Sequence, residues 1–297
     1  MLLLALAAPE AFDILGITTV AGNVPLHLTQ RNARLMCELA GRDDVPVFAG
    51  CDRPLVRELV TAEMVHGRSG IDGMDIHTPR IPLQEQHAVD FIIDRLLAAG
   101  DEPITLVLTG PLTNLATAIA KQPDILPRIA EIVLMGGALR EGGNSTPSAE
   151  FNIYVDPHAA QAVFHCGRPI SVAGLDVTHQ VMVPRKFLDR LRALDTRVAT
   201  ATVNMLEFFN RYDREKYHTE GAPLHDPCTI AYLLQPGLFE GKLCNLEVET
   251  ESALTLGHTA VDFWQVTGRP ANVTWLHRVD SAGFFELLID RLARLAD

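Results

Sequence analysis

The chain has 297 residues, of which 47% are hydrophobic and 21% charged, as expected for a globular protein with a large buried core. Its net charge of -12 argues against nucleic acid and anionic membranes as partners, because both attract a basic surface. The five cysteines are scattered and form no CxxC pair, which predicts reduced thiols in a cytoplasmic protein rather than disulfides or a zinc site.

The first eight residues, Met1 to Ala8, form an apolar, helix-like run without a cap. The run is too short to span a bilayer, and it lacks the basic segment that precedes the apolar part of a signal peptide. A helix that begins without a cap or a preceding strand resembles the continuation of an earlier segment. We therefore expect the start of the gene to lie upstream of Met1.

Strands and helices then alternate along the chain. The expected strands are apolar runs, and the expected helices repeat apolar residues with a period near 3.6. We expect strands over residues 12–20, 45–49, 104–109, 132–135 and 169–173, and helices over residues 29–40, 84–99, 112–121, 157–166, 184–193, 199–212 and 225–234. Residues 57–80 are polar and irregular, and a loop of that length is usually functional or mobile.

The end of the chain has a different pattern. Three strand-like runs, at 245–250, 259–264 and 273–279, follow one another before a last amphipathic helix at 281–295. Strands that are apolar throughout and alternate with helices are typical of a parallel sheet covered on both faces. We predict one α/β domain over residues 1–297. It has a doubly wound, mostly parallel sheet with helices on both faces and a small antiparallel C-terminal addition.

One loop concentrates polar side chains directly after a predicted strand. Gly136 and Gly137 end the strand, and the loop then carries Asn144, Glu150 and Asn152. Ligands bind just past the carboxyl ends of strands in α/β sheets. A carboxylate and two carboxamides would suit a polyhydroxylated ligand. The alternative is a polar surface loop without function.

His225, Asp226 and Pro227 form the sharpest single motif. An aspartate before a proline can cap a helix, with the histidine incidental. In the functional interpretation, Asp226 binds a metal or a sugar hydroxyl, and His225 moves a proton near neutral pH. The sequence has no GxGxxG loop, no GxxxxGK[ST] loop and no GxSxG elbow, which argues against dinucleotide, nucleoside triphosphate and serine-hydrolase functions.

Five segments together resemble the inosine-uridine-preferring nucleoside hydrolase family. In chain order they are residues 17–24, Leu134–Gly137, Ala149–Asn152, Asp156-Pro157 and His225–Pro227. Each is weak alone, but five in the right order are specific, and the resemblance covers essentially the whole chain. It implies hydrolysis of ribonucleosides to ribose and free base, in purine or pyrimidine salvage, with a calcium ion in an α/β domain. It also implies a small-molecule ribonucleoside as partner and a homo-oligomer, a dimer or tetramer.

The resemblance assigns the sugar-binding positions. Asn23, Glu150 and Asn152 would hold ribose hydroxyls, Asn144 would lie near the 5'-hydroxyl, and Met135 would pack on the sugar. Carboxylate and carboxamide groups around the ribose suit the reaction, because breaking an N-glycosidic bond gives the sugar oxocarbenium character.

The resemblance also assigns the metal and the leaving base. The Thr109 carbonyl and the Asp226 carboxylate would be calcium ligands, and His225 would donate a proton to the base. His66 would line the base pocket, with a solvent-exposed loop histidine as the alternative. Tyr217 lies where several relatives place an aromatic or hydroxyl group near the base, in a looser alignment. Whether purines or pyrimidines are preferred stays open.

One departure from the family is serious. The family begins with a strand followed by an Asp-x-Asp-Pro-Gly-x-Asp-Asp motif, which supplies most of the charged calcium ligands and the base that activates water, and this motif is absent here. Calcium takes about six to eight oxygen ligands, so we expect weak or no calcium binding by this chain. We expect the missing strand and aspartates upstream of Met1. The alternative functions are a catalytically impaired ribose- or nucleoside-binding relative and an α/β domain without such a site.

Overall fold

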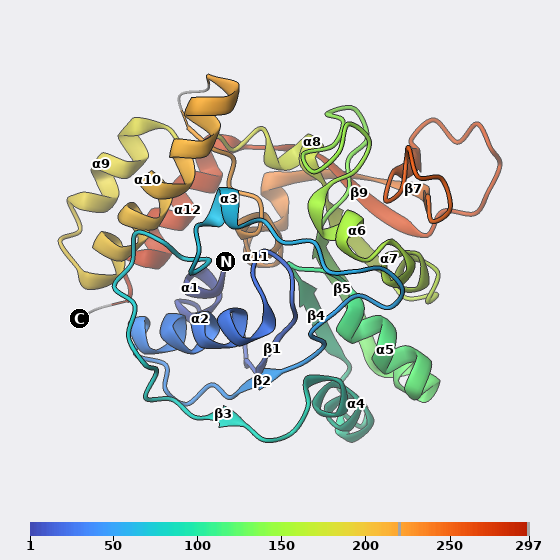
Figure 1. Cartoon of the computed structure of the whole chain (residues 1–297), viewed down its shortest axis with the longest axis horizontal. Helices are drawn as coiled ribbons and strands as arrows, with labels where there is room; N and C mark the ends of the chain where they lie inside the picture. Colours follow the sequence, from blue (N-terminus) through green and yellow to red (C-terminus); the bar gives the residue numbers. More distant parts are fainter. Residues whose placement is uncertain (219–220, 296–297) are drawn as a thin grey trace.

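The computed structural model describes residues 1–218 and 221–295, apart from the side chains of Asp213 and Tyr217. In this part of the chain the strands form two sheets (Figure 1). The first sheet has the order β1-β2-β3 and is parallel, and the second has the order β4-β5-β6-β9-β7-β8. The strands are β1 (Ile17–Thr19), β2 (Val47–Ala49), β3 (Leu83–Gln84), β4 (Ile104–Leu108), β5 (Ile129–Met135), β6 (Ile170–Ala173), β7 (Phe239–Val248), β8 (Thr259–Asp262) and β9 (Val273–Val279).

The helices pack on both faces of the second sheet. They are α1 (Leu2–Leu6), α2 (Leu26–Leu39), α3 (Glu63–His66), α4 (Ala88–Ala98), α5 (Thr113–Lys121), α6 (Phe151–Val155), α7 (Pro157–Phe164), α8 (Leu175–Thr178), α9 (Arg185–Arg192), α10 (Arg197–Tyr217), α11 (Pro227–Leu234) and α12 (Ser281–Leu292), with 3-10 turns at Pro123–Arg128 and Pro236–Leu238. Helices α9, α10 and α12 gather on one side of the molecule, and α4, α5 and α7 on the other (Figure 1). None of these described helices has the length and apolar character needed to cross a bilayer.

Neighbouring side chains of the central strands point to opposite faces of the second sheet, and each face carries its own hydrophobic core. Trp275 of β9 packs with β5, α5 and α7, whereas its neighbour Leu276 packs with α1, α11 and α12. Val172 and Ala173 of β6 divide in the same way between these two cores. Successive side chains of a strand point to opposite faces, so a sheet covered on both sides needs apolar residues at every position.

The α/β class, the helices on both faces and the antiparallel C-terminal strands are confirmed, but one detail of the prediction is wrong. The run 273–279 is β9, which pairs in parallel with β6 and antiparallel with β7, and β7 pairs antiparallel with β8. The first three strands form a sheet of their own rather than part of one sheet. The single-domain organisation stays a prediction.

A side chain joins the two sheets. Asn114 of α5 donates from Nδ2 to the Thr19 carbonyl of β1 at 3.0 Å and accepts from Cys51 N, just past β2, at 2.8 Å. Asn114 is buried, so both bonds are shielded from water. This carboxamide therefore fixes the ends of β1 and β2 against the helix that follows β4.

Candidate active site

The loops after β1 and β4 meet at the carboxyl edge of the sheets. Gly22, in the loop after β1, packs closely on Pro111 in the loop after β4. A β carbon at Gly22 would lie 2.9 Å from Pro111 Cδ. The Asn23 carbonyl accepts a hydrogen bond from Ala62 N at 2.8 Å, which attaches the segment leading to α3. The half-buried Asn23 side chain makes no hydrogen bond to a described residue. It is therefore available to a ligand at this edge.

The turn after β5 is held in place from several directions. Gly137 has a φ of +79°, a conformation that favours glycine. Its carbonyl accepts from Leu175 N at 2.9 Å, and its amide donates to Glu150 Oε2 at 3.1 Å. Further along, the Asp176 carboxylate accepts from the backbone amides of residues 139 and 140 at 2.7 and 2.8 Å. The turn is thus tied both to α6 and to α8.

Glu150 is a buried carboxylate at the N-terminal end of α6. Its side chain is the helix cap, and Oε2 accepts from Ile153 N at 3.2 Å as well as from the turn after β5. Burial raises the pKa of Glu150 to about 7. The charge of Asp226 also makes a small contribution to the raised pKa of Glu150, whereas the hydrogen bonds from backbone amides lower it.

Asn152 and Met135 lie together at the end of β5. Asn152 Nδ2 donates to the Met135 carbonyl at 3.0 Å, and both residues are buried. The carboxamide of Asn144, by contrast, is exposed, and its Oδ1 accepts from Phe151 N at 2.9 Å. Asn144 therefore shapes the loop before α6 through its own hydrogen bond, whereas Asn152 lies inside the site region.

His225 precedes α11 and is linked to α8. Its Nδ1 lies 2.8 Å from the hydroxyl of Thr178, which is fully buried. The ring of His179 lies 5.8 Å away, and that imidazole is bound to Glu141 at 2.9 Å. Burial lowers the pKa of His225 to about 3, with smaller contributions from His179 and His66. His225 is therefore a neutral imidazole at pH 7 in the ligand-free site.

Asp226 does not act as a helix cap. It lies before Pro227 at the start of α11, in a right-handed helical conformation, and its side chain makes no capping hydrogen bond. Burial raises the pKa of its carboxyl to about 6. The other Asp-Pro pair behaves differently, because Asp156 accepts from Ala159 N at 3.1 Å and caps α7. The charged neighbour of Asp226 is the N-terminal ammonium group of Met1, which acts to lower the pKa of the Asp226 carboxyl.

The base-pocket candidates come from α3 and α10. His66 stacks on Phe209 with ring centroids 5.5 Å apart and an interplanar angle of 19°. Burial lowers the pKa of His66 to about 4, and its charge makes a small contribution to the lowered pKa of His225. His66 is therefore half-buried and packed, unlike a loop histidine in solvent. Tyr217 ends α10, and its side chain lies outside the described part of the structure.

The described residues do not fit a calcium ion. Thr109 directly follows β4, and Asp226 is the one carboxylate assigned to the metal. Across residues 1–218 and 221–295, no group of three or more histidine, cysteine, aspartate or glutamate side chains is placed to hold a metal. A hard cation needs about six to eight oxygens, and this donor set supplies far fewer.

The structure adds residues that the sequence interpretation missed. Thr178, His179 and Phe209 contact the candidate histidines, although they lie far from them in the chain. The position of α8 directly after β6, at a strand end, is a signal that points to Thr178 and His179. Phe209 carries no such signal, because an aromatic residue on a helix more often belongs to a core.

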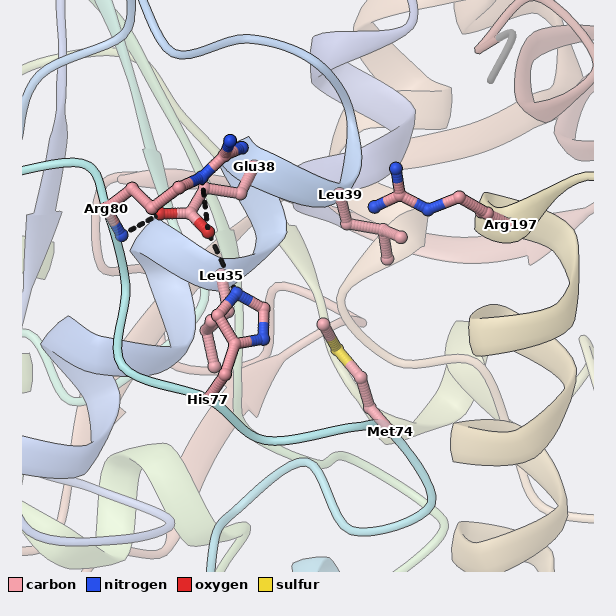
Figure 2. A pocket seen from close by; sticks show the side chains of 7 residues that line it. All are labelled: Leu35, Glu38, Leu39, Met74, His77, Arg80 and Arg197. Carbon is pink, nitrogen blue, oxygen red and sulfur yellow. Dashed lines mark hydrogen bonds and ion pairs between the residues drawn. The ribbon is translucent and has the colours of Figure 1, made fainter.

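A separate cavity of about 240 Å³ lies between α2 and α10 and contains none of the predicted site residues. Figure 2 shows Glu38 of α2 at its wall, bonded to His77 and Arg80 of the long loop, with Arg197 on the opposite side. The buried Glu38 carboxylate accepts from His77 Nε2 at 3.0 Å and from the amides of Arg80 and Ile81. It thereby anchors the end of the loop that carries His66.

Comparison with known proteins places these features in a family context. The family model described as inosine-uridine preferring nucleoside hydrolase matches residues 1–286. An uncharacterized Schizosaccharomyces pombe protein is 50% identical over 293 residues, covering 99% of this chain and 94% of that protein. The pyrimidine-specific ribonucleoside hydrolase RihA of Shewanella sp. (strain ANA-3) is 47% identical, covering 98% and 91%. The solved purine-preferring ribonucleoside hydrolase from Gardnerella vaginalis superposes with a TM-score of 0.91 at 32% identity, covering 99% and 93%.

Proposed function

Since the chain belongs to the inosine-uridine preferring nucleoside hydrolase family, we propose that it hydrolyses the N-glycosidic bond of ribonucleosides to ribose and free base. The observation that carries this proposal is the uncapped carboxylate of Asp226, which interacts with the buried Glu150 and directly follows His225 in the chain. Two carboxylates and an adjacent imidazole are the groups that glycosidic cleavage requires.

The carboxylates stabilise the sugar as the bond breaks. The ribose gains positive charge in the transition state, and negative groups in a site with little water stabilise that charge strongly. Burial raises the pKa of both Glu150 and Asp226, so a cationic sugar is a favourable neighbour for their charged forms. Asn23 and Asn152 add carboxamide groups that bind ribose hydroxyls.

The imidazoles act on the base. A departing base gains negative charge, and the N–H of the neutral His225 imidazole stabilises that charge by donating a hydrogen bond. His66, stacked on Phe209, lines the space for the base. Similarity to pyrimidine-specific hydrolases at 47% identity supports uridine and cytidine as preferred substrates over inosine, although the purine-preferring relative is 32% identical.

A second candidate function is that of a ribose- or nucleoside-binding relative with impaired turnover. The donor set described above favours it, because the residues present do not fit the calcium ion that the family resemblance implies. Both functions need the same sugar-binding groups. They differ only in whether bound nucleoside is converted to product.

We also propose a homo-oligomer in a reducing compartment. Leu243 of β7 and two residues just after β8, Trp264 and Val266, expose 62%, 71% and 83% of their surface, which suits an interface. All five cysteines are free thiols, which supports a cytoplasmic location. Light scattering after size-exclusion chromatography measures the mass, and a monomer at all concentrations argues against the oligomer.

Release of ribose from uridine, cytidine, inosine and guanosine tests the proposed function directly. We expect ribose and free base in equal amounts, with the pyrimidine nucleosides turned over fastest. Equilibrium binding of the same nucleosides by calorimetry separates the two candidates. Binding without ribose release favours the impaired relative, and neither binding nor release rejects both.

A further inference from the structure

Thr178 presents a buried hydroxyl to the ring of His225. The threonine is the last residue of α8 and is fully buried, and its Oγ1 lies 2.8 Å from His225 Nδ1. A hydroxyl has a single proton to donate, and two acceptors are within reach. The Leu175 carbonyl lies 3.5 Å from Oγ1, at the outer limit for a hydrogen bond. The imidazole nitrogen is the closer of the two possible acceptors.

The helix that carries Thr178 is firmly positioned. Asp176 binds the backbone amides of residues 139 and 140, and Leu175 N donates to the Gly137 carbonyl at 2.9 Å. These bonds join α8 to the turn after β5, which also contacts Glu150. The hydroxyl is thus fixed relative to the sugar-binding side of the site rather than carried by a free loop.

The other nitrogen of His225 has a different environment. Nε2 makes no hydrogen bond to any residue in the part of the chain that the structure describes, whereas Nδ1 has the Thr178 hydroxyl. In a neutral imidazole one nitrogen carries the proton and the other accepts. A hydroxyl that donates to Nδ1 therefore leaves the proton on Nε2, the nitrogen that is free to meet a ligand.

We propose that Thr178 is a positioning residue that donates to Nδ1 of His225 and thereby keeps the imidazole proton on Nε2, where the N–H can donate a hydrogen bond to the leaving base as negative charge develops on it. The effect on the leaving base rests on the proposed hydrolase function. The hydrogen bond between Thr178 and His225 does not depend on that function. The opposite arrangement has Nδ1–H donating to Thr178 and the hydroxyl donating to Leu175. It leaves Nε2 bare and unable to donate a hydrogen bond to a base.

Nitrogen NMR of the full chain with labelled histidine tests the hydrogen bond without any need for activity. Comparison with His225→Gln identifies the signals of His225. In the wild type at neutral pH we expect a protonated Nε2 and a bare Nδ1. Thr178→Val removes the hydroxyl at nearly constant shape and should shift the tautomer population, and Thr178→Ser should restore it. A wild-type ring protonated on Nδ1, or a Thr178→Val ring unchanged from the wild type, overturns the proposal.

Kinetics test the consequence. Thr178→Val should lower kcat on uridine by about 10² or more, as expected for loss of general acid catalysis, while KM changes little. It should leave p-nitrophenyl riboside nearly unaffected, because p-nitrophenolate leaves without a proton. Thr178→Ser should recover turnover of uridine. Equal losses on both substrates overturn the positioning role. If the wild type hydrolyses neither substrate, the proposed function fails and the NMR result alone decides the hydrogen bond.

Discussion

Glu150 and Asp226 interact across the site although they come from opposite parts of the chain, and the charge of Asp226 contributes to the raised pKa of Glu150. The first lies at the start of α6, after β5, and the second at the start of α11. Glu150 is held by the backbone amides of Gly137 and Ile153, whereas Asp226 makes no capping bond. Glu150 therefore shapes the site through backbone hydrogen bonds, whereas the charge of Asp226 is opposed by the N-terminal ammonium group of Met1.

The two Asp-Pro pairs provide matched variants. Asp156 accepts hydrogen bonds from Ala159 N, Leu55 N and the Thr113 hydroxyl, so Asp156→Ala should destabilise the fold by about 2 kcal/mol or more. Asp226→Ala removes no capping bond, so any fall in the midpoint of thermal unfolding should be smaller than for Asp156→Ala. It should instead reduce turnover of uridine and of p-nitrophenyl riboside equally, since ribose orientation matters whatever group leaves. A large drop in stability for Asp226→Ala contradicts this assignment.

The role of His225 can be tested with two substrates whose leaving groups differ in their need for a proton. His225→Ala should lower kcat on uridine or inosine by about 10²–10⁴, the usual contribution of a general acid. The same variant should turn over p-nitrophenyl riboside at close to the wild-type rate, because this leaving group needs no proton. If His225 only packs beside α11, the losses will be small and alike on both substrates.

Glu150 makes stability depend on pH with a defined sign. Burial raises its pKa from 4.5 to about 7 in the folded state, so the folded state holds this proton more tightly than the unfolded chain does. The contribution of Glu150 to stability is therefore favourable at low pH and is lost as pH rises from about 4.5 through 7. Glu150→Gln keeps a side-chain oxygen that can accept from the backbone amides, but the side chain no longer titrates. Thermal unfolding of both proteins at several pH values should show the wild type losing stability relative to the variant over this interval, and parallel curves would refute the assignment.

Calcium should bind weakly to this chain. The described residues place no cluster of three or more suitable side chains, and Asp226 alone cannot satisfy the cation. Isothermal calorimetry with calcium chloride should give little heat, and Asp226→Asn serves as the matched control. A tight isotherm with one ion per chain would show that the ligand assignment is wrong.

Phe209 should matter for the base rather than the sugar. Its ring stacks on His66, and Phe209→Leu keeps an apolar side chain while removing the stacked ring. We expect a several-fold rise in KM for uridine with a smaller change in kcat, and a change in the ratio of uridine to inosine turnover. Unchanged constants for both nucleosides would exclude His66 and Phe209 from the base pocket.

Local sequence determined most of the elements and the family. Apolar runs such as Ile132 to Met135 and the 3.6-residue periodicity of the helices depend on neighbours along the chain, so they were predictable within a few residues. The motifs around Glu150, Asn152 and Asp226 are also local and were sufficient to indicate the family. Sequence alone left open whether Asp226 caps a helix. Both Asp156-Pro157 and Asp226-Pro227 are Asp-Pro pairs before a helix, yet only Asp156 forms the capping hydrogen bond.

Tertiary structure decided what depends on packing between distant segments. β9 is buried on both faces, by Trp275 on one side and Leu276 on the other, and it joins the parallel strand β6 to the antiparallel strand β7. Its own sequence does not reveal these neighbours. Thr178 reaches His225 only because the fold brings the end of α8 beside the segment that precedes α11. A hydrogen bond depends on distance and direction in space, and only the folded chain brings those two side chains within 2.8 Å of each other.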